Sequence, residues 1–108
     1  KRVNDAGILI VAGTDTGFYG VFTGVASHLE LILHTEAGLK TSDIIKAATI
    51  NAARMIGREK DSGTIEEGKI ADLLILDANP LDDIRNIKRI HRVIKSGTVF
   101  DPVELLKR

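Results

Sequence analysis

The feature that most constrains this fold is a short apolar run, Ile-Leu-Ile-Val-Ala at residues 8–12, bounded by Gly7 and Gly13. The run is rich in β-branched residues and does not alternate between apolar and polar side chains. A continuous apolar run of this length predicts a strand that is buried on both faces. Such strands occur in parallel sheets that are covered by helices, so the run favours an α/β fold.

Two helices are predicted after this strand. Apolar residues recur at three- and four-residue steps over residues 24–37, which indicates a helix with one apolar face, and Gly38 is suited to the left-handed position that ends it. A second apolar face predicts a helix over residues 42–56. The Thr41 hydroxyl can cap its first turn, and Gly57 can end it.

The second half of the chain changes to short β segments. A strand with a tight turn is predicted over residues 63–69, a strand over 70–76, one helical turn over 82–87, a hairpin of strands 90–95 and 98–100 around Ser96-Gly97, and a short helix or frayed end after Pro102. The chain therefore divides into an α/β part, residues 1–57, and a mainly β part, residues 58–108.

The composition excludes several classes of protein. Lys and Arg total 15 and Asp and Glu total 15, so no basic field favours nucleic acid or an anionic membrane as the partner. The chain has no cysteine, which excludes disulfides and iron–sulfur clusters and is compatible with a cytoplasmic location. No apolar run is long enough to span a membrane. Because the sequence begins with Lys1 rather than Met, we expect it to be a piece of a longer protein.

The most informative polar residue is Asp15, within Gly13-Thr14-Asp15-Thr16-Gly17. The motif follows the predicted strand directly, at the end where parallel α/β proteins gather their ligands and catalytic groups. An Asp at this position can bind a divalent metal, act as a general base, or order its own loop through an Asx turn. Position alone leaves these alternatives open.

A second interpretation is phosphate binding, because a strand, a glycine-rich loop and a helix follow one another in the required order. The loop, residues 13–24, lacks both phosphate-binding glycine motifs and contains Phe18, Tyr19 and Phe22, which suit an apolar pocket or a partner surface better. The histidines do not form a metal pair either. His28 and His34 are six residues apart on one predicted helix, and His91 lies in the β part.

Four stretches taken together resemble a known family: residues 7–15, 30–39, 47–57 and 63–73, the last followed by Asn-Pro-Leu at 79–81. Their order and spacing are similar to the C-terminal part of the amidohydrolase superfamily, closest to its imidazolonepropionase-like and Xaa-Pro-dipeptidase-like hydrolases. Each stretch alone is weakly specific, whereas the combination is highly specific and covers nearly the whole chain.

The resemblance implies a fold and a site. Residues 8–12 would be the eighth strand of a (β/α)₈ TIM barrel, residues 24–56 would supply its closing helices, and the strands after residue 58 would join a small composite β-sandwich. Asp15 would be a metal ligand, with Zn²⁺ the expected ion, and would help to activate the hydrolytic water. The family's other ligands, including a His-x-His pair, have no match in this sequence, so we expect the chain alone to be inactive and to bind no metal.

The expected function is therefore hydrolysis of an amide or cyclic amide C–N bond, with a small-molecule or dipeptide-like substrate, by the longer protein. The alternative is a stand-alone binding module without catalysis. Because the apolar run at residues 8–12 would be uncovered in the isolated chain, we also expect it to self-associate or to pair with a missing N-terminal part.

Overall fold

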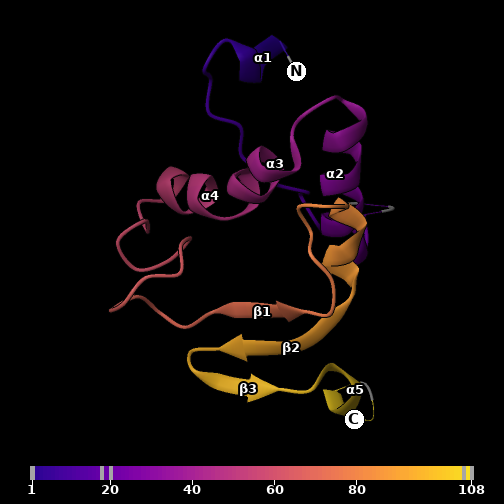
Figure 1. Ribbon diagram of the computed structural model, residues 1–108, viewed down its shortest axis with the longest axis vertical. Coiled ribbons are helices and arrows are strands. Elements are labelled where there is room, and N and C mark those ends of the chain that lie inside the picture. The colour runs from indigo at the N-terminus through magenta and orange to yellow at the C-terminus, as the bar shows by residue number, and fades with distance from the viewer. Residues whose placement is uncertain (1, 18, 20, 106, 108) are drawn as a thin grey trace.

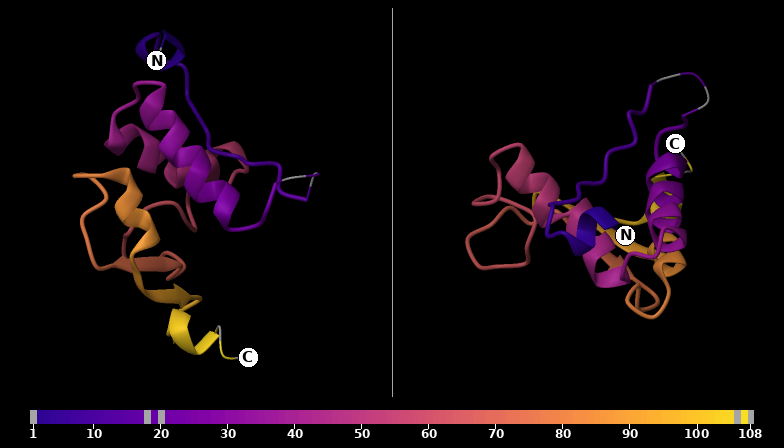
Figure 2. Two further views of the ribbon diagram at one scale, coloured as in Figure 1. Left: turned by 90° about the vertical axis from the view of Figure 1, so that its right-hand side faces the viewer. Right: turned by 90° about the horizontal axis from the view of Figure 1, so that it is seen from above.

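The computed structural model describes residues 2–17, 19, 21–105 and 107. The chain is α/β, with a group of helices next to a small antiparallel sheet (Figure 1). The elements are α1 (Arg2–Asp5), α2 (Val25–Glu36), α3 (Thr41–Ala48), α4 (Ile50–Met55), β1 (Leu73–Leu76), the 3₁₀ helix η1 (Ile84–Lys88), β2 (Ile90–Lys95), β3 (Thr98–Phe100) and α5 (Pro102–Leu105). The first and last helices lie at opposite ends of the molecule (Figure 2).

The predicted strand over residues 8–12 is wrong for this structure. Residues 8–15 run from α1 towards the glycine loop without forming a strand, and the Ile8 and Leu9 side chains are more than half exposed. A strand exists only where a neighbouring strand completes its hydrogen bonds. Within the described residues, the sheet has only the strands β1, β2 and β3, and none of them pairs with this segment. A (β/α)₈ barrel and a β-sandwich remain predictions from the resemblance.

The helix predicted over residues 24–37 is confirmed as α2, and it ends just before Gly38, as predicted. Gly38 has a positive φ of 83°, and its N–H donates to the Thr35 carbonyl at 2.8 Å. The Leu39 N–H donates to the His34 carbonyl at 3.1 Å. These two bonds form a Schellman motif, in which a left-handed glycine lets the chain satisfy the last helical carbonyls.

The single helix predicted over residues 42–56 forms as two helices, because the backbone breaks at Thr49 (φ −125°, ψ −96°). The Thr49 hydroxyl donates to the Ile45 carbonyl at 2.7 Å, a bond of the kind that bends helices. The predicted cap is also wrong. Thr41 is the first residue of α3, Lys40 occupies the N-cap position, and no side chain caps the helix.

The strand predicted over residues 63–69 is likewise wrong, although the tight turn is present. Residues 58–70 form a loop that Lys69 holds from inside. Its Nζ donates to the Glu59 carbonyl at 2.8 Å and to the Thr64 hydroxyl. The Lys69 N–H closes the turn on the Glu66 carbonyl at 3.3 Å. Because Lys69 draws together two points of this segment, the chain curls instead of extending.

The hairpin of β2 and β3 forms as the sequence predicts. Ser96 and Gly97 both have positive φ, 49° and 80°, as a two-residue hairpin turn of matching twist requires. β2 is the central strand and pairs antiparallel with both β1 and β3, in the order β1-β2-β3. The predicted helical turn near residues 82–87 is η1, and the predicted helix after Pro102 is α5.

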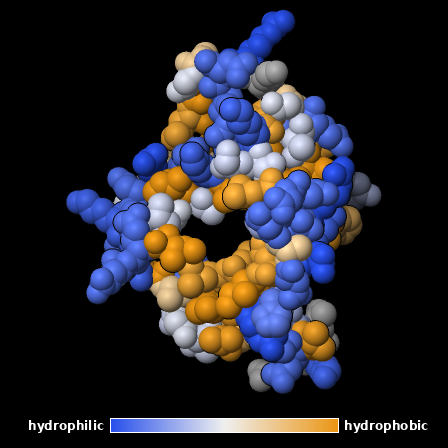
Figure 3. Space-filling model, in the orientation of Figure 1, coloured by the Kyte–Doolittle hydropathy of each residue, from blue (hydrophilic) through white to orange (hydrophobic). Residues whose placement is uncertain are grey.

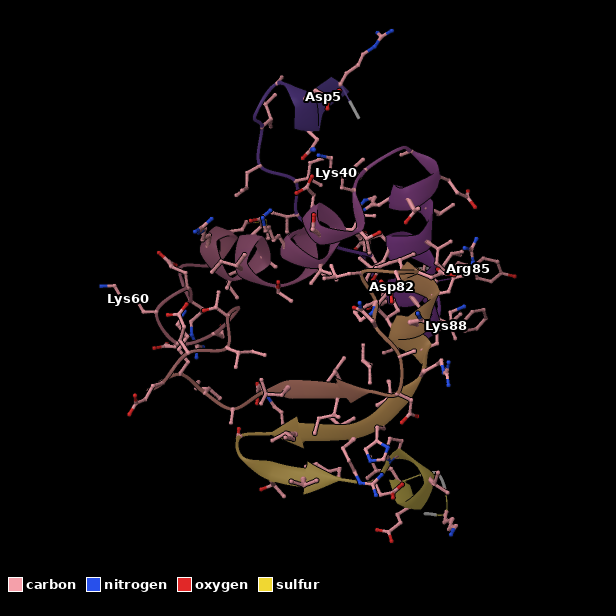
Figure 4. All side chains as sticks on the ribbon, viewed as in Figure 1. Asp5, Lys40, Lys60, Asp82, Arg85 and Lys88 are labelled. Carbon is pink, nitrogen blue, oxygen red and sulfur yellow. The ribbon has the colours of Figure 1, made fainter. Side chains whose placement is uncertain are left out.

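The core joins the two parts of the chain. Ile44 of α3 is fully buried, and Ile84 of η1 and Leu39 pack with it at 2% and 8% exposure. Ile10 and Ile87 are among the half-buried side chains around this cluster. The charged residues of η1 face the other way: Arg85 and Lys88 project outward from the helix (Figure 4). This core therefore fixes the segment that contains Ile10 against α3 and η1.

Candidate functional site

Three backbone groups of residues 10–13 are held by three different helices. The Ile10 carbonyl accepts a hydrogen bond from Asn51 Nδ2 of α4 at 2.9 Å. The Ala12 N–H donates to the Ala47 carbonyl of α3 at 3.1 Å. The Gly13 N–H donates to Glu30 Oε1 of α2 at 2.8 Å. These bonds hold the segment, for which the described residues show no strand pairing.

The direction of these bonds alternates along the segment. Ile10 and Ala12, two residues apart, bond towards α3 and α4, whereas Gly13 bonds towards α2. Backbone groups of successive residues point to opposite sides when a chain is extended. Figure 2 shows the segment passing between α2 on one side and α3 and α4 on the other. The helices therefore hold the chain from both sides just before Asp15.

Asp15 lies on the surface where this held segment becomes the glycine loop. Its φ is 48°, in the left-handed region, which is uncommon for residues other than glycine and more frequent for Asp and Asn. Within the described part of the chain, no hydrogen bond or ion pair engages its carboxylate, so the Asx turn to Gly17 does not form there. Among the described residues, the carboxylate is exposed at the surface.

A groove of about 480 Å³ lies beside this segment, between it and α2. Its size is that of a small-molecule site, and its walls are mostly apolar. On α2 the apolar lining recurs every four residues, at Val25, Leu29 and Leu33, and each of these side chains is at least half exposed. The lining residues are Gly13, Thr14, Val21, Phe22, Val25, Ala26, Leu29, Glu30 and Leu33.

The loop beyond Asp15 carries the aromatic residues that the sequence analysis singled out. Phe22 lines the groove at 73% exposure, and Tyr19 is 99% exposed. Phe18 lies outside the described residues. Figure 2 shows this loop extending away from the helices. The Tyr19 and Phe22 rings are therefore mostly exposed and do not anchor the loop on the described part of the chain.

The described residues do not bring together a metal centre. No group of three or more His, Asp or Glu side chains in that part of the chain could hold an ion. His91 instead pairs with Asp77, with 3.0 Å between Nδ1 and Oδ1, on the sheet side of the molecule. Zinc sites in proteins use three or four protein ligands. Asp15 supplies one carboxylate, so the described residues do not provide a complete zinc site.

Residues 1–100 match the model of the Amidohydrolase family, and the chain belongs to that family. The resemblance found in the sequence is thereby confirmed. Imidazolonepropionase of Thermoanaerobacter pseudethanolicus is 33% identical over 102 residues, which cover 89% of this chain and 24% of that protein. Ochratoxinase of Aspergillus niger is 38% identical over 100 residues, 88% of this chain and 20% of that protein.

The three-dimensional structure is similar to solved members with related names. A Xaa-Pro dipeptidase, crystallised with methionine bound in its active site, superposes with a TM-score of 0.81 at 31% identity and covers 93% of this chain and 24% of that one. The chain thus spans about a quarter of the length of the relatives that it matches. In the described residues, no helix is long and apolar enough to cross a membrane.

Sequence reasoning missed the roles of Glu30 and Asn51. Both lie in stretches that carry the family resemblance, yet their partners are 17 and 41 residues away along the chain. Along the sequence, Glu30 stands out only as a carboxylate next to the apolar residues of the predicted helix. This position indicates that Glu30 has a hydrogen-bond partner, but it does not identify Gly13 as that partner.

Proposed function

We propose that this chain is the C-terminal part of a metal-dependent hydrolase that cleaves an amide or cyclic amide C–N bond. The observation that carries the proposal is the family match over residues 1–100, which includes the motif around Asp15. Relatives named imidazolonepropionase, ochratoxinase and Xaa-Pro dipeptidase support the reaction class. A small-molecule or dipeptide-like substrate and a cytoplasmic location are part of the same proposal.

We assign Asp15 two roles in this hydrolase, as one ligand of a divalent ion such as Zn²⁺ and as the proton carrier. When bound, such an ion supplies Lewis acidity and a more acidic water. The Asp15 carboxylate accepts the proton that the attacking water loses as the new C–O bond forms. It then transfers this proton to the leaving nitrogen as the C–N bond breaks. The surface position of Asp15, directly after residues that line a groove of substrate size, is compatible with both roles.

We further propose that the exposed apolar surfaces of this chain are covered by the remainder of the hydrolase. Figure 3 shows an opening between the helices and the sheet that is bordered by hydrophobic residues. Met55, Ile56 and Leu74 are all more than half exposed. Without that cover, the same surfaces would pair between copies, because contiguous exposed apolar surface favours association.

The test uses the whole protein that carries this chain, with Asp15→Asn compared against Asp82→Asn, a change at an exposed carboxylate beside η1. Hydrolysis of Xaa-Pro dipeptides and of imidazolonepropionate is measured together with bound metal. We expect Asp15→Asn to lower kcat by about 10²–10⁴-fold, the usual contribution of a general base, and Asp82→Asn to leave kcat unchanged. Full activity of Asp15→Asn would contradict the role of Asp15. A protein with neither metal nor hydrolysis would instead support the non-catalytic binding module.

A further inference from the structure

Glu30 is a charged residue in a mostly apolar groove. Its neighbours in the lining on α2 include Val25, Leu29 and Leu33, and its own residue is half-buried. The Glu30 carboxylate accepts a hydrogen bond from the Gly13 N–H, at 2.8 Å from Oε1, where the groove is open to water.

The bond between Glu30 and Gly13 differs from the other two anchors of the segment in strength and position. Its acceptor is an ionised side chain, and charge-assisted hydrogen bonds are roughly twice as strong as neutral ones. Gly13 is also the anchored residue nearest to Asp15, only two residues before it. The bond ties the exit of the segment to α2, a helix of 12 residues.

We propose that Glu30 is a positioning residue that fixes where the Asp15 carboxylate lies; this inference rests on the proposed function of Asp15. Asp15 lies on the surface with a left-handed backbone, and the Gly13 N–H that Glu30 holds is two residues before it. The bond at Gly13 ties the backbone to α2 at that point, so its loss should displace the carboxylate. Catalytic groups lose about 10²-fold in rate when they are displaced by about 1 Å, so the bond would matter for catalysis.

Three variants of the whole protein separate positioning from simple stability. Glu30→Ala removes the acceptor, whereas Glu30→Gln keeps an oxygen that can accept from the Gly13 N–H. Glu36→Ala is the control, because Glu36 lies on the same helix, is exposed and does not line the groove. The readouts are hydrogen exchange of the peptide covering residues 8–17, bound metal, kcat and KM.

We expect Glu30→Ala to speed amide exchange within residues 8–17 by about 10- to 100-fold, the effect of losing one charge-assisted bond, while exchange in β1, β2 and β3 stays unchanged. Metal content and kcat should fall, and KM should change little, because a displaced proton carrier acts on the chemical step. Glu30→Gln should restore most of both properties, and Glu36→Ala should match the wild type.

Two results would overturn the inference: unchanged exchange of residues 8–17 in Glu30→Ala, or faster exchange with kcat and metal content both at wild-type values. If Glu30→Ala does not fold, Glu30→Gln decides, because it keeps the acceptor oxygen: exchange and kcat close to wild type support the inference, and a loss of kcat as large as that of Asp15→Asn overturns it. The Asp15→Asn variant is measured alongside. Wild-type activity there would refute the proposed function, while the exchange data would still report whether Glu30 holds the segment.

Discussion

Replacing Ile44 with alanine should destabilise the protein more than any change on its surface. Ile44 is fully buried between Leu39 and Ile84, so the mutation deletes three carbons from the centre of the core. Each buried methylene contributes about 0.8 kcal/mol, which gives about 2.4 kcal/mol for the lost transfer free energy. The cavity that remains raises the expected cost to about 3–4 kcal/mol, within the usual range for such truncations.

The consequence should be large, because domains of this size are stable by only about 5–15 kcal/mol. Because the isolated chain is expected to self-associate, both forms are compared at one chain concentration. Thermal unfolding followed by circular dichroism should show a fall in Tm of at least about 10 °C, and urea unfolding should give the difference in free energy. Ile65→Ala is the matched control, since that side chain is 86% exposed and its truncation should cost less than about 0.5 kcal/mol.

The same experiment tests whether the two parts of the chain share one core. Ile44 comes from α3 and Ile84 from η1, so the mutation should weaken the helices and the sheet in a single transition. A cost below about 1 kcal/mol for Ile44→Ala, or an unfolding curve in which the sheet keeps its wild-type midpoint, would refute this description of the core.

Three further predictions follow from particular contacts. The pKa of Asp72 is lowered first by the hydrogen bond from Lys95 and then by that from the Ser96 N–H. The stabilisation that the Asp72 carboxylate gives the folded chain should therefore be complete above its unfolded pKa of about 4, and it should disappear as the pH falls through the lower folded pKa. Urea midpoints of wild type and Asp72→Asn should therefore converge at low pH, and a constant difference down to pH 2 would contradict this. Gly63→Ala should strongly destabilise the folded chain, because the new Cβ would lie 2.8 Å from the Cβ of Ala53 and the backbone φ is 92°. Gly68→Ala is the control for urea unfolding and should cost less, because its φ is similar, 86°, but its Cβ would meet no atom within 4 Å. The isolated chain should scatter light as an oligomer, and a monodisperse, cooperatively folding monomer would show that its exposed apolar surface needs no partner.

The sequence by itself determined the elements whose causes are local. Gly38 ends α2 because a left-handed residue completes the final carbonyl bonds, and this signal lies within a few residues of the helix. Ser96 and Gly97 form the hairpin for the same kind of reason, since two adjacent positive φ values set the turn. The family, too, was evident from the order of short motifs along the chain.

Only the tertiary structure decided the elements that depend on distant partners. An apolar run at residues 8–12 has the composition of a buried strand, yet a strand needs neighbours that the described chain does not provide. Residues 63–69 have a strand-like pattern, but Lys69 reaches the Glu59 carbonyl ten residues away and closes a loop instead. The break at Thr49 likewise separates α3 from α4, and each then holds one end of the segment before Asp15.

In the candidate site, too, one residue could be identified from the sequence and its contacts could not. Asp15 could be selected from the sequence, because a carboxylate between glycines directly after an apolar run is a local pattern. Its surroundings could not, since Glu30 meets Gly13 only after the loop and α2 fold back on the segment. Local steric and hydrogen-bonding preferences act over a few residues and can be read along the chain, whereas a contact between distant residues exists only once packing has brought them together.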